Sequence, residues 1–468
     1  MSSEMQMGET QSPHSGNSPD EGMSINASIE KACGEIPSDI SLCVTEYTLG
    51  DYVSLVRGTT YKGALVNLPG PVLLGLASIQ SDGGFRWGAF KTYGGECPAK
   101  ITLTSGDLYV SLKDVTQSGD LLGSVARVPK QIESGRLTQD TVKLELSGRP
   151  VNTSYLYWLL RTPQYREYCR SRATGTTTLG LAREDFLAFP IADPNPEQDS
   201  LVELLEEVEE RIELLSETNA TLEAIAQALF KSWFVDFDPV HARVRGEQPE
   251  GLTPEVAALF PDTFEESELG MVPKGWKYVS LKEATDIFDS KRIPLAGQER
   301  AKRKGPYPYY GAAALMDWVD DYIFDGVYLL MGEDGSVADA SGYPITQYVW
   351  GKIWVNNHAH VLQGRNGIST EHLMLALKGV NIQPFITGAV QAKLSQSNMW
   401  RIQFLMPTQS VASAFADLIS PMFAKIRDNS EQAQTLANLR DTLLPRLISG
   451  QLRLPDAQTL LNYMDTAQ

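Results

Sequence analysis

The sequence contains little cysteine, and the spacing of what it has excludes two classes of small, cross-linked protein. Cys33, Cys43, Cys97 and Cys169 are the only four cysteines among 468 residues, and no two of them form a CxxC pair. Scattered cysteines of this kind fit neither a disulfide framework nor a zinc site made of thiolates. The pattern favours a reducing compartment, and we expect a cytoplasmic protein.

Long apolar runs are also missing. No stretch of about 18 consecutive apolar residues occurs, and the start, MSSEMQMGETQSPHSGNSPDEGMS, lacks the apolar core of a signal peptide. We therefore expect neither a membrane span nor export, and a poorly ordered tail over residues 1–42. The chain is 42% hydrophobic, which is typical of a globular protein. At about 150 residues per domain, its length predicts two to four domains.

Signatures of several enzyme classes are absent as well. The sequence has no GxxxxGK[ST] phosphate loop, and it has neither NPPF nor DPPY, the motif of adenine methyltransferases that flip their target base. ATP hydrolysis and methyl transfer are therefore not expected on this chain. A metal-dependent nuclease is one alternative, because Asp236, Asp238 and His241 stand close together in DFDPVHA. Asp-Pro turns at a helix end explain the same residues.

A second metal hypothesis concerns His358 and His360 in NNHAH. Residues two apart in a strand share a face, so both imidazoles could meet one ion. No third ligand is evident nearby in the sequence, however. We favour buried, hydrogen-bonding histidines and predict no metal on this chain.

Basic residues are outnumbered, since 40 Lys and Arg face 58 Asp and Glu for a net charge of -18. Taken alone, that balance argues against nucleic acid as a partner, because phosphate contacts need clustered cations. The charges are unevenly distributed, however. Residues 197–217 are dense in acid, whereas KRIPLAGQERAKRK at 291–304 holds six basic residues and one acidic. This basic segment is a candidate for phosphate contacts, and a solvated loop would explain it equally.

Two segments have the spacing of long helices that each need a partner. From Leu201, apolar residues recur in alternating steps of four and three, which is the a and d spacing of a coiled coil, and a segment from Phe415 repeats it. The polar Asn219 in this seam either fixes the pairing register or caps a kink. Pro421 should kink the second helix or mark its start. The predicted seam consists of Leu201, Leu205, Val208, Ile212, Leu215, Asn219, Leu222, Leu229, Trp233, Phe415, Met422, Ile426, Leu436, Leu443 and Leu447.

The chain also repeats itself. YVSL occurs at 52–55 and at 278–281, and the segments TGTTTLGLAREDFLAFPIADP and TGAVQAKLSQSNMWRIQFLMP each place Leu seven and Pro twenty residues after their first Thr. We infer a duplication, in which each half is a variable domain followed by a long helix. Short β-rich runs with helices expected at 152–171 and 370–379 predict mixed α/β domains. The Pro- and Gly-rich connector predicts an extended wrap with one short helix near 254–260.

Three segments resemble a known family. They are FKSWFVDFDPVHA (230–242), KGPYPYYGAAALMDWVDDYIFDGVYLLMGEDGS (304–336) and GKIWVNNHAHVL (351–362). With the repeat, they make residues 43–450 resemble the specificity subunit of type I restriction-modification systems.

The resemblance implies an α/β protein with an internal pseudo-twofold repeat. Two target recognition domains would each read one half of a split, asymmetric DNA site, and two long antiparallel coiled-coil helices would separate them. It implies no catalytic centre on this chain. The implied partners are double-stranded DNA, two methyltransferase (modification) subunits and restriction/translocase subunits, with S-adenosylmethionine, ATP and Mg on those subunits.

This organisation predicts the following boundaries: an N-terminal tail at 1–42, recognition domain 1 at 43–194, a spacer helix at 195–236, a connector at 237–275, recognition domain 2 at 276–406, a second spacer helix at 407–450 and a C-terminal tail at 451–468. A helix of about 35 residues spans roughly 50 Å, which exceeds the ~34 Å of one turn of duplex.

The candidate DNA contacts are basic and planar side chains in both domains, with arginine best suited to a bidentate contact with guanine. They are Arg57, Tyr61, Lys62, Arg86, Lys91, Arg170, Arg172, Lys291, Arg292, Arg300, Lys302, Arg303, Lys304, Tyr307, Tyr309 and Tyr310. Core packing around a turn would also explain the tyrosines. A coiled-coil scaffold without DNA readout is a further alternative, but it would not explain two large domains with matching ends.

Overall fold

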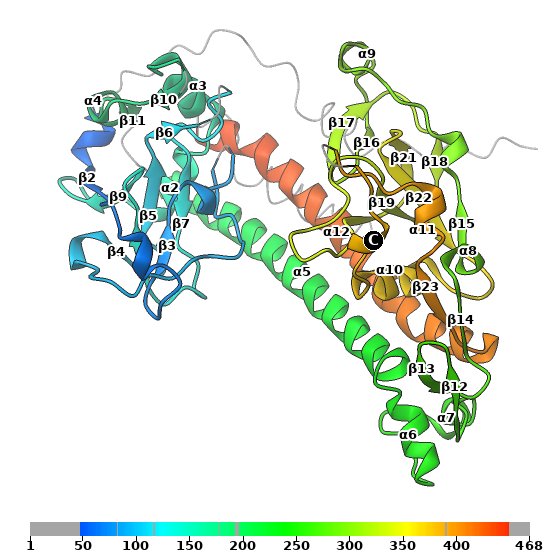
Figure 1. The fold of residues 1–468 in the computed structure, drawn as a ribbon. Coiled ribbons are helices and arrows are strands. Elements are labelled where there is room, and N and C mark those ends of the chain that lie inside the picture. The colour runs from blue at the N-terminus through cyan, green and yellow to red at the C-terminus, as the bar shows by residue number, and fades with distance from the viewer. Residues whose placement is uncertain are drawn as a thin grey trace, which may run out of the picture. The chain divides into compact units, whose positions relative to one another are not determined.

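The computed structural model describes residues 47–448 except 82, 116–117, 177, 192–195 and 389–390. The expected tails at 1–42 and 451–468 lie outside this range. The described chain forms two compact units, one made of 47–151 with 165–191 and the other of 152–164 with 196–448 (Figure 1). No helix in this part of the chain has both the length and the apolar character needed to cross a membrane.

The first unit is a mixed α/β domain built on an antiparallel sheet. The strand order is β2-β9-β5-β7, and a second sheet of order β3-β8-β4 pairs β3 and β8 in parallel. Buried side chains such as Leu74, Tyr109 and Leu137 fill the core. The elements are β1 (Tyr47–Thr48), β2 (Val53–Arg57), β3 (Val72–Leu74), β4 (Thr102–Leu103), β5 (Leu108–Ser111), β6 (Lys113–Asp114), β7 (Val125–Arg127), β8 (Gly135–Leu137), β9 (Thr141–Leu146), α3 (Pro163–Ser171), β10 (Leu179–Gly180), α4 (Arg183–Leu187) and β11 (Pro190–Ile191).

The second unit combines another mixed α/β domain with two long helices. One antiparallel sheet has the order β15-β22-β19-β20, and the other, β17-β16-β21-β18, contains a parallel pair, β16 with β21. The strands are β12 (Phe264–Ser267), β13 (Gly270–Pro273), β14 (Lys277–Ser280), β15 (Thr285–Ile287), β16 (Tyr307–Tyr310), β17 (Leu315–Val319), β18 (Phe324–Asp325), β19 (Tyr328–Gly332), β20 (Thr346–Val349), β21 (Lys352–Val355), β22 (Ala359–Gly364) and β23 (Gln403–Met406). The helices are α2 (Thr153–Leu159), α5 (Pro196–Phe234), α6 (Asp238–Val244), α7 (Pro254–Ala257), α8 (Leu281–Ala284), α9 (Gly297–Lys302), α10 (Thr370–Lys378), α11 (Gln396–Met399) and α12 (Gln409–Ile448).

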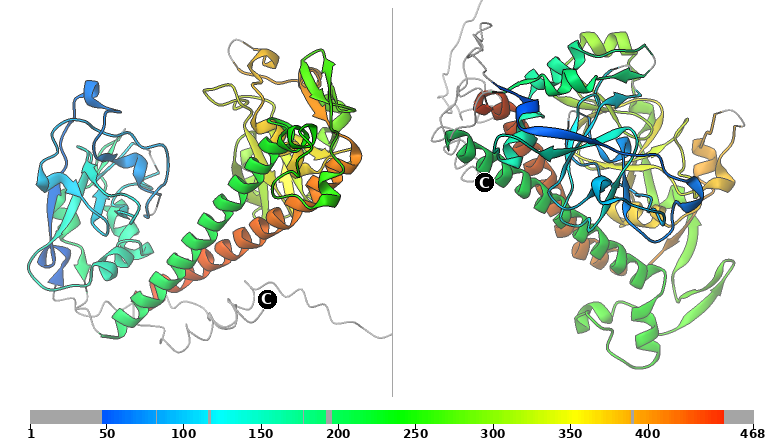
Figure 2. Two further views of the ribbon diagram at one scale, coloured as in Figure 1. Left: turned by 90° about the horizontal axis from the view of Figure 1, so that it is seen from below. Right: turned by 90° about the vertical axis from the view of Figure 1, so that its left-hand side faces the viewer.

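The helices α5 and α12, of 39 and 40 residues, pack side by side (Figures 1 and 2). The relative direction of the two helices follows from two contacts. The ring of Trp233 lies 5.3 Å from that of Phe415, whereas Glu209, earlier in α5, meets Arg440, late in α12, at 2.5 Å. The helices therefore run antiparallel.

The predicted seam residues lie on the covered faces of these helices. Val208 and Leu215 pack in one buried cluster with Leu436, and Ile212 lies against it. Every predicted seam residue whose side chain is described is buried or partly buried, and the side chain of Leu447 lies outside the described part. Leu214, by contrast, is 53% exposed. Whether the packing follows coiled-coil geometry throughout stays a prediction.

The polar Asn219 joins the two helices. Its Nδ2 donates to the backbone oxygen of Ile426 at 3.1 Å and to Oγ of Ser430 at 3.0 Å, and Asn429 Nδ2 donates to Asn219 Oδ1 at 2.8 Å. These contacts agree with the register interpretation rather than the kink interpretation.

Pro421 does not mark the start of the second helix. The helix α12 begins at Gln409 and continues through Pro421. The proline lies on the exposed face, where water can bind the carbonyl oxygen that loses its helical partner.

Polar contacts fix both a neighbouring helix and the second domain to this pair. In α2, Trp158 Nε1 donates to Glu206 at 2.8 Å, and Arg161 lies 3.3 Å from Glu209. Burial raises the pKa of Glu209, but Arg161 and Arg440 outweigh burial and hold the pKa below its ordinary value. At the domain, Trp350 Nε1 donates to Glu431 of α12 at 2.7 Å.

The connector is more structured than an extended wrap. It contains α6 as well as the expected short helix α7, followed by the β12–β13 hairpin. Pro239 stands in the first turn of α6 and Pro254 begins α7. Prolines at these places start helices rather than keep the chain extended.

The matched ends of the two domains make the same hydrogen bonds. Thr174 and Gly180 exchange two backbone hydrogen bonds of 2.9 and 2.8 Å, and Thr387 and Lys393 exchange two of 2.8 Å. In both loops the threonine hydroxyl also donates to the same backbone oxygen. The two TG loops are therefore closed by the same hydrogen bonds.

The two YVSL copies, by contrast, are not equivalent. Leu281 N, at the end of the second copy, donates to Ile402 O before β23. In the first domain it is Leu49 N, before the first copy, that donates to Phe189 O before β11. Hydrogen bonding thus matches 278–281 with the segment ending at Leu49, so the YVSL match was wrong as an alignment.

Candidate nucleic-acid interface

The basic run of the second domain folds around the edge strand β17. In the β16–β17 hairpin, Asp317 receives Arg300 Nε at 3.2 Å and Lys304 Nζ at 2.5 Å. The hydrogen bond from Lys304, with a second from the backbone of Trp318, lowers the pKa of Asp317 to about 2. One carboxylate therefore holds two cations, which leaves this small cluster with a net positive charge.

The other cations of the basic run differ in how exposed they are and in whether they form an ion pair. Lys302 is exposed at the end of α9. Arg303 pairs with Asp320 at 2.9 Å and lies over the ring of Trp354, 4.8 Å from its centroid. Lys291 is exposed and lies 5.2 Å from the ring centroid of Phe288. Lys302 and Lys291 are thus the most accessible cations for a phosphate among these three.

Arg292, in contrast, is committed to the interior of the domain. Its Nη1 donates to Glu333 at 2.8 Å and to the backbone oxygen of Ala359 at 2.6 Å, and its Nε donates to Asp289 O at 3.0 Å. The side chain is 11% exposed. Its geometry is that of a structural ion pair, while its contact with DNA stays a prediction.

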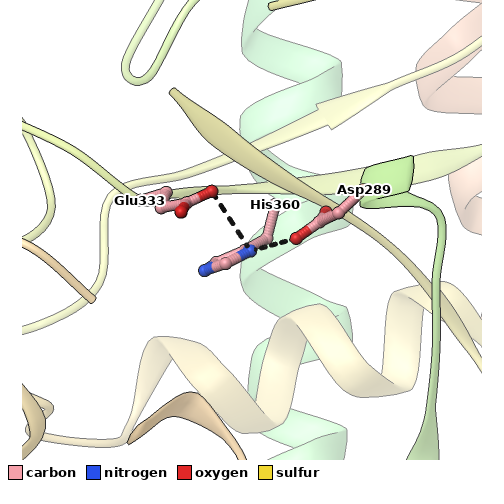
Figure 3. Close-up of side chains that lie close together, drawn as sticks. All are labelled: Asp289, Glu333 and His360. Carbon is pink, nitrogen blue, oxygen red and sulfur yellow. Dashed lines mark hydrogen bonds and ion pairs between the residues drawn. The ribbon is translucent and has the colours of Figure 1, made fainter. Parts of the chain in front are cut away.

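Arg292 belongs to a network around His360 (Figure 3). The imidazole is 1% exposed, with Nδ1 at 2.6 Å from Asp289 and 3.7 Å from Glu333, and Nε2 at 2.8 Å from Leu394 O. His360 is therefore a buried, hydrogen-bonded histidine, as expected. The expectation was wrong for His358, whose side chain is 48% exposed and lies 3.8 Å from Asp334.

Asp289, Glu333 and His360 have the spacing of ligands for a metal ion. Sequence reasoning missed this group, because Asp289 lies 71 residues from His360. The guanidinium of Arg292 already supplies a cation to both carboxylates, at 3.3 Å from Asp289 and 2.8 Å from Glu333. The donors are thus used in an internal ion-pair network, and a metal would have to displace Arg292.

The three tyrosines after the basic run take different positions. Tyr309 is 1% exposed, and its hydroxyl accepts a hydrogen bond from Leu295 N at 3.0 Å. Tyr310 is partly buried, and burial raises its pKa. Tyr307 stacks against Tyr322 at 5.1 Å. Tyr309 therefore follows the core-packing interpretation.

In the first domain the candidates lie on separate surface loops and element ends. Arg57 ends β2, and Tyr61 and Lys62 follow it, all three exposed. Arg86 and Lys91 are exposed on either side of Trp87. Arg170 is exposed in α3, and Arg172 pairs with Asp185 at 3.1 Å. The fold does not assign base contacts among them.

The residues of the nuclease alternative do not assemble. Among the described residues, the ligand atoms of Asp236, Asp238 and His241 form no cluster of metal-binding size. Asp236 instead pairs with Lys231, and the ring of His241 lies 4.7 Å from that of Phe264. Asp238 begins α6, which agrees with the turn interpretation.

Comparison with known proteins gives a consistent result. Residues 273–436 match the type I restriction modification DNA specificity domain. The type I restriction enzyme HindI specificity subunit of Haemophilus influenzae is 24% identical over 420 residues, which cover 74% of this chain and 89% of that protein. The MjaIX specificity subunit of Methanocaldococcus jannaschii is 24% identical over 323 residues, covering 65% of this chain and 70% of that protein.

A solved structure shares the fold. The S subunit of a type I restriction-modification system from M. genitalium aligns with a TM-score of 0.51 at 17% identity, over 88% of this chain and 98% of that one.

The structure thus combines two α/β domains and a pair of long helices with a basic segment, residues 291–304, that precedes the β16–β17 hairpin. The matches relate this chain to one family. It is similar to the specificity subunits of type I restriction-modification systems, and the matches support a role in DNA sequence specificity.

Proposed function

We propose that this chain reads a split DNA site as the specificity subunit of a type I complex. Each domain would read one half-site, a short base sequence that we call a word. The observation that carries the proposal is the recurrence of one loop. The Thr174–Gly180 and Thr387–Lys393 hydrogen-bond pairs end two α/β domains, each followed by a long helix. Two domains of one kind, related by a pseudo-twofold repeat, suit two words with an unread gap between them.

The long helices are the proposed spacer, packed as an antiparallel coiled coil. A helix of 39 residues spans about 58 Å at 1.5 Å per residue. That length exceeds the ~34 Å of one turn of duplex. A rigid support of this length would set the gap without affecting which bases are read.

The same helices would dock two methyltransferase subunits. Glu203, Glu207 and Glu210 are exposed on α5. Such an acidic row repels DNA and suits a basic protein surface. The chain itself would carry no catalytic centre, while S-adenosylmethionine, ATP and Mg would bind to the methyltransferase and restriction/translocase subunits. The complex would work on double-stranded DNA in the cytoplasm.

The first test is a map of methyladenine in cells that express this chain with its methyltransferase and no other methylase. A split motif with a fixed gap is expected. In the variant Lys302→Gln/Lys304→Gln, DNA affinity should fall, and the slope of log affinity against log salt should decrease by about two. The matched control, Lys274→Gln/Lys277→Gln, removes the same charge from another part of the same unit and should change neither.

Methylation without sequence preference, from a well-formed complex, would reject the proposal. It would favour the alternative, a coiled-coil scaffold that leaves DNA readout to its partners.

A further inference from the structure

Two tryptophans stand out from the rest of the molecule. The sequence has eight, all among the described residues, and six of them are buried or partly buried. Trp87 is 55% exposed and Trp318 is 46% exposed. One lies in the first domain and the other in the second domain.

Trp318 faces outward because of its place on β17. This strand forms the edge of its sheet, and Trp318 stands opposite Pro308 of β16. Its neighbour Val319 points the other way, into a core cluster. Met316 is the extra residue of a β-bulge in this strand, and its sulfur accepts a hydrogen bond from Asn356 Nδ2 at 3.5 Å. The strand thus presents the indole of Trp318 to the outside.

Cations lie on the other face of the same edge strand. Asp317, one residue before Trp318, shares the face of Val319 and holds Arg300 and Lys304. Asp317 is therefore a positioning residue that keeps two cations at the edge of the sheet where Trp318 is exposed.

Trp87, the exposed tryptophan of the first domain, also lies in a segment with basic residues. Arg86 and Lys91 are exposed on either side of it in the sequence. The indole packs edge-on against Phe85 at 5.0 Å, with Phe90 at 6.4 Å. These rings limit the movement of the indole without covering it.

Charge decides what can cover these side chains. Another exposed apolar pair, Leu269 and Met271 at 58% each, lies in a hairpin with Glu266 and Glu268, where DNA would be repelled. The two indoles, by contrast, lie in segments that carry lysine and arginine, with Arg86 and Lys91 near Trp87 in the sequence and Arg300 and Lys304 on the other face of β17. Double-stranded DNA satisfies both features, since its phosphates bind cations and its thymine methyl groups offer apolar contacts in the major groove.

We propose that Trp87 and Trp318 contact bases, each in the half-site that its own domain reads. The indole would pack on the methyl group of thymine in the major groove, and the cations of the same segment would bind phosphates. The inference rests on the proposed function, because it takes each domain to read one word. It goes beyond the proposed function by naming one side chain in each domain that would help to determine the base preference.

The test uses the complex with its methyltransferase and the variants Trp318→Ala and Trp87→Ala. Each variant should relax the base preference in one half of the motif only, and the two variants should affect opposite halves. Loss of the contact with one base pair should weaken binding to a duplex carrying the wild-type motif about ten- to a hundredfold. Trp318→Phe should retain most of the affinity. Leu269→Ala, equally exposed in the acidic hairpin, is the matched control and should keep the motif.

The outcomes separate the two levels of the argument. A wild-type split motif that persists unchanged in both tryptophan variants overturns the inference and leaves the proposed function intact. Equal weakening of both halves by either variant also overturns it, because a base contact acts locally. Absence of any split motif with the wild-type chain rejects the proposed function and the inference with it.

Discussion

Among single residues, His372 is an imidazole held in an apolar setting. It is 1% exposed, its Nδ1 has no hydrogen-bond partner, and the rings of Phe234 and Phe415 lie 4.5 and 5.1 Å away. Burial lowers the pKa of His372 from 6.5 to about 3. The imidazole is therefore neutral in the folded protein at neutral and mildly acidic pH.

This burial predicts a loss of stability in mild acid. As pH falls below 6.5, the unfolded chain binds a proton at His372 and the folded chain does not, so unfolding becomes easier until pH approaches about 3. In His372→Phe, the fall in melting temperature from pH 7 to pH 5 should be smaller than in the wild type. His241→Phe, at an exposed histidine, is the control. Parallel curves for wild type and His372→Phe would contradict the prediction.

Residue roles could be predicted from sequence only where they depend on near neighbours. The basic run was identifiable, but the separate fates of Arg292 and Lys302 were not. Arg292 is buried by contacts with Glu333 and Ala359, 41 and 67 residues away. The exposed Trp318 was missed because its outward direction depends on the pairing of β16 with β17, which composition does not reveal.

Among the elements, the packed faces of α5 and α12 contain a polar layer with apolar layers on either side of it. Asn219 and Asn429 face each other there, and Asn429 is 1% exposed. A paired polar layer lowers stability relative to an apolar one, but it disfavours every other register, since a shifted helix would bury unpaired amides.

A double-mutant cycle tests this layer. Asn219→Leu removes the acceptor of the buried Asn429 amide and should lower the free energy of unfolding by about 1–3 kcal/mol. The double variant Asn219→Leu/Asn429→Leu removes both polar groups and should recover that loss. Urea denaturation followed by circular dichroism measures both, with Thr221→Leu on the exposed face of α5 as control. Additive losses in the double variant would show that the two amides do not act as a pair.

Element prediction succeeded where a local period carries the signal. The alternating steps of four and three gave both long helices, because side-chain periodicity is a property of one segment. The prediction that Pro421 marks the start of the second helix was wrong, because a proline on the exposed face of a helix can be accommodated within it. YVSL was wrong as an alignment, because four residues do not show which strand they pair with.

For the whole molecule, the two domains end alike but are not copies in detail. Their TG loops share hydrogen bonds, while the segments that follow differ at most positions, LAREDFL (181–187) against LSQSNMW (394–400). Shared hydrogen bonding with different side chains agrees with the proposal that each domain reads a different half-site. The loop preserves the fold, and exposed side chains such as Trp87 and Trp318 are free to differ in their surroundings.

The length of the helix pair is the remaining variable, and it can be changed without touching either domain. One heptad inserted after Ser216 and one after Gln432 would lengthen both helices between the asparagine layer and the Glu209–Arg440 ion pair, so both contacts and the apolar seam persist. Seven residues add about 10.5 Å, or about three base pairs at 3.4 Å each. The methylated motif should therefore keep both words and gain about three base pairs in its gap. A heptad in α5 alone shifts the helices out of register and should abolish the motif, whereas an unchanged gap in the paired insertion would mean that something other than these helices sets the spacing.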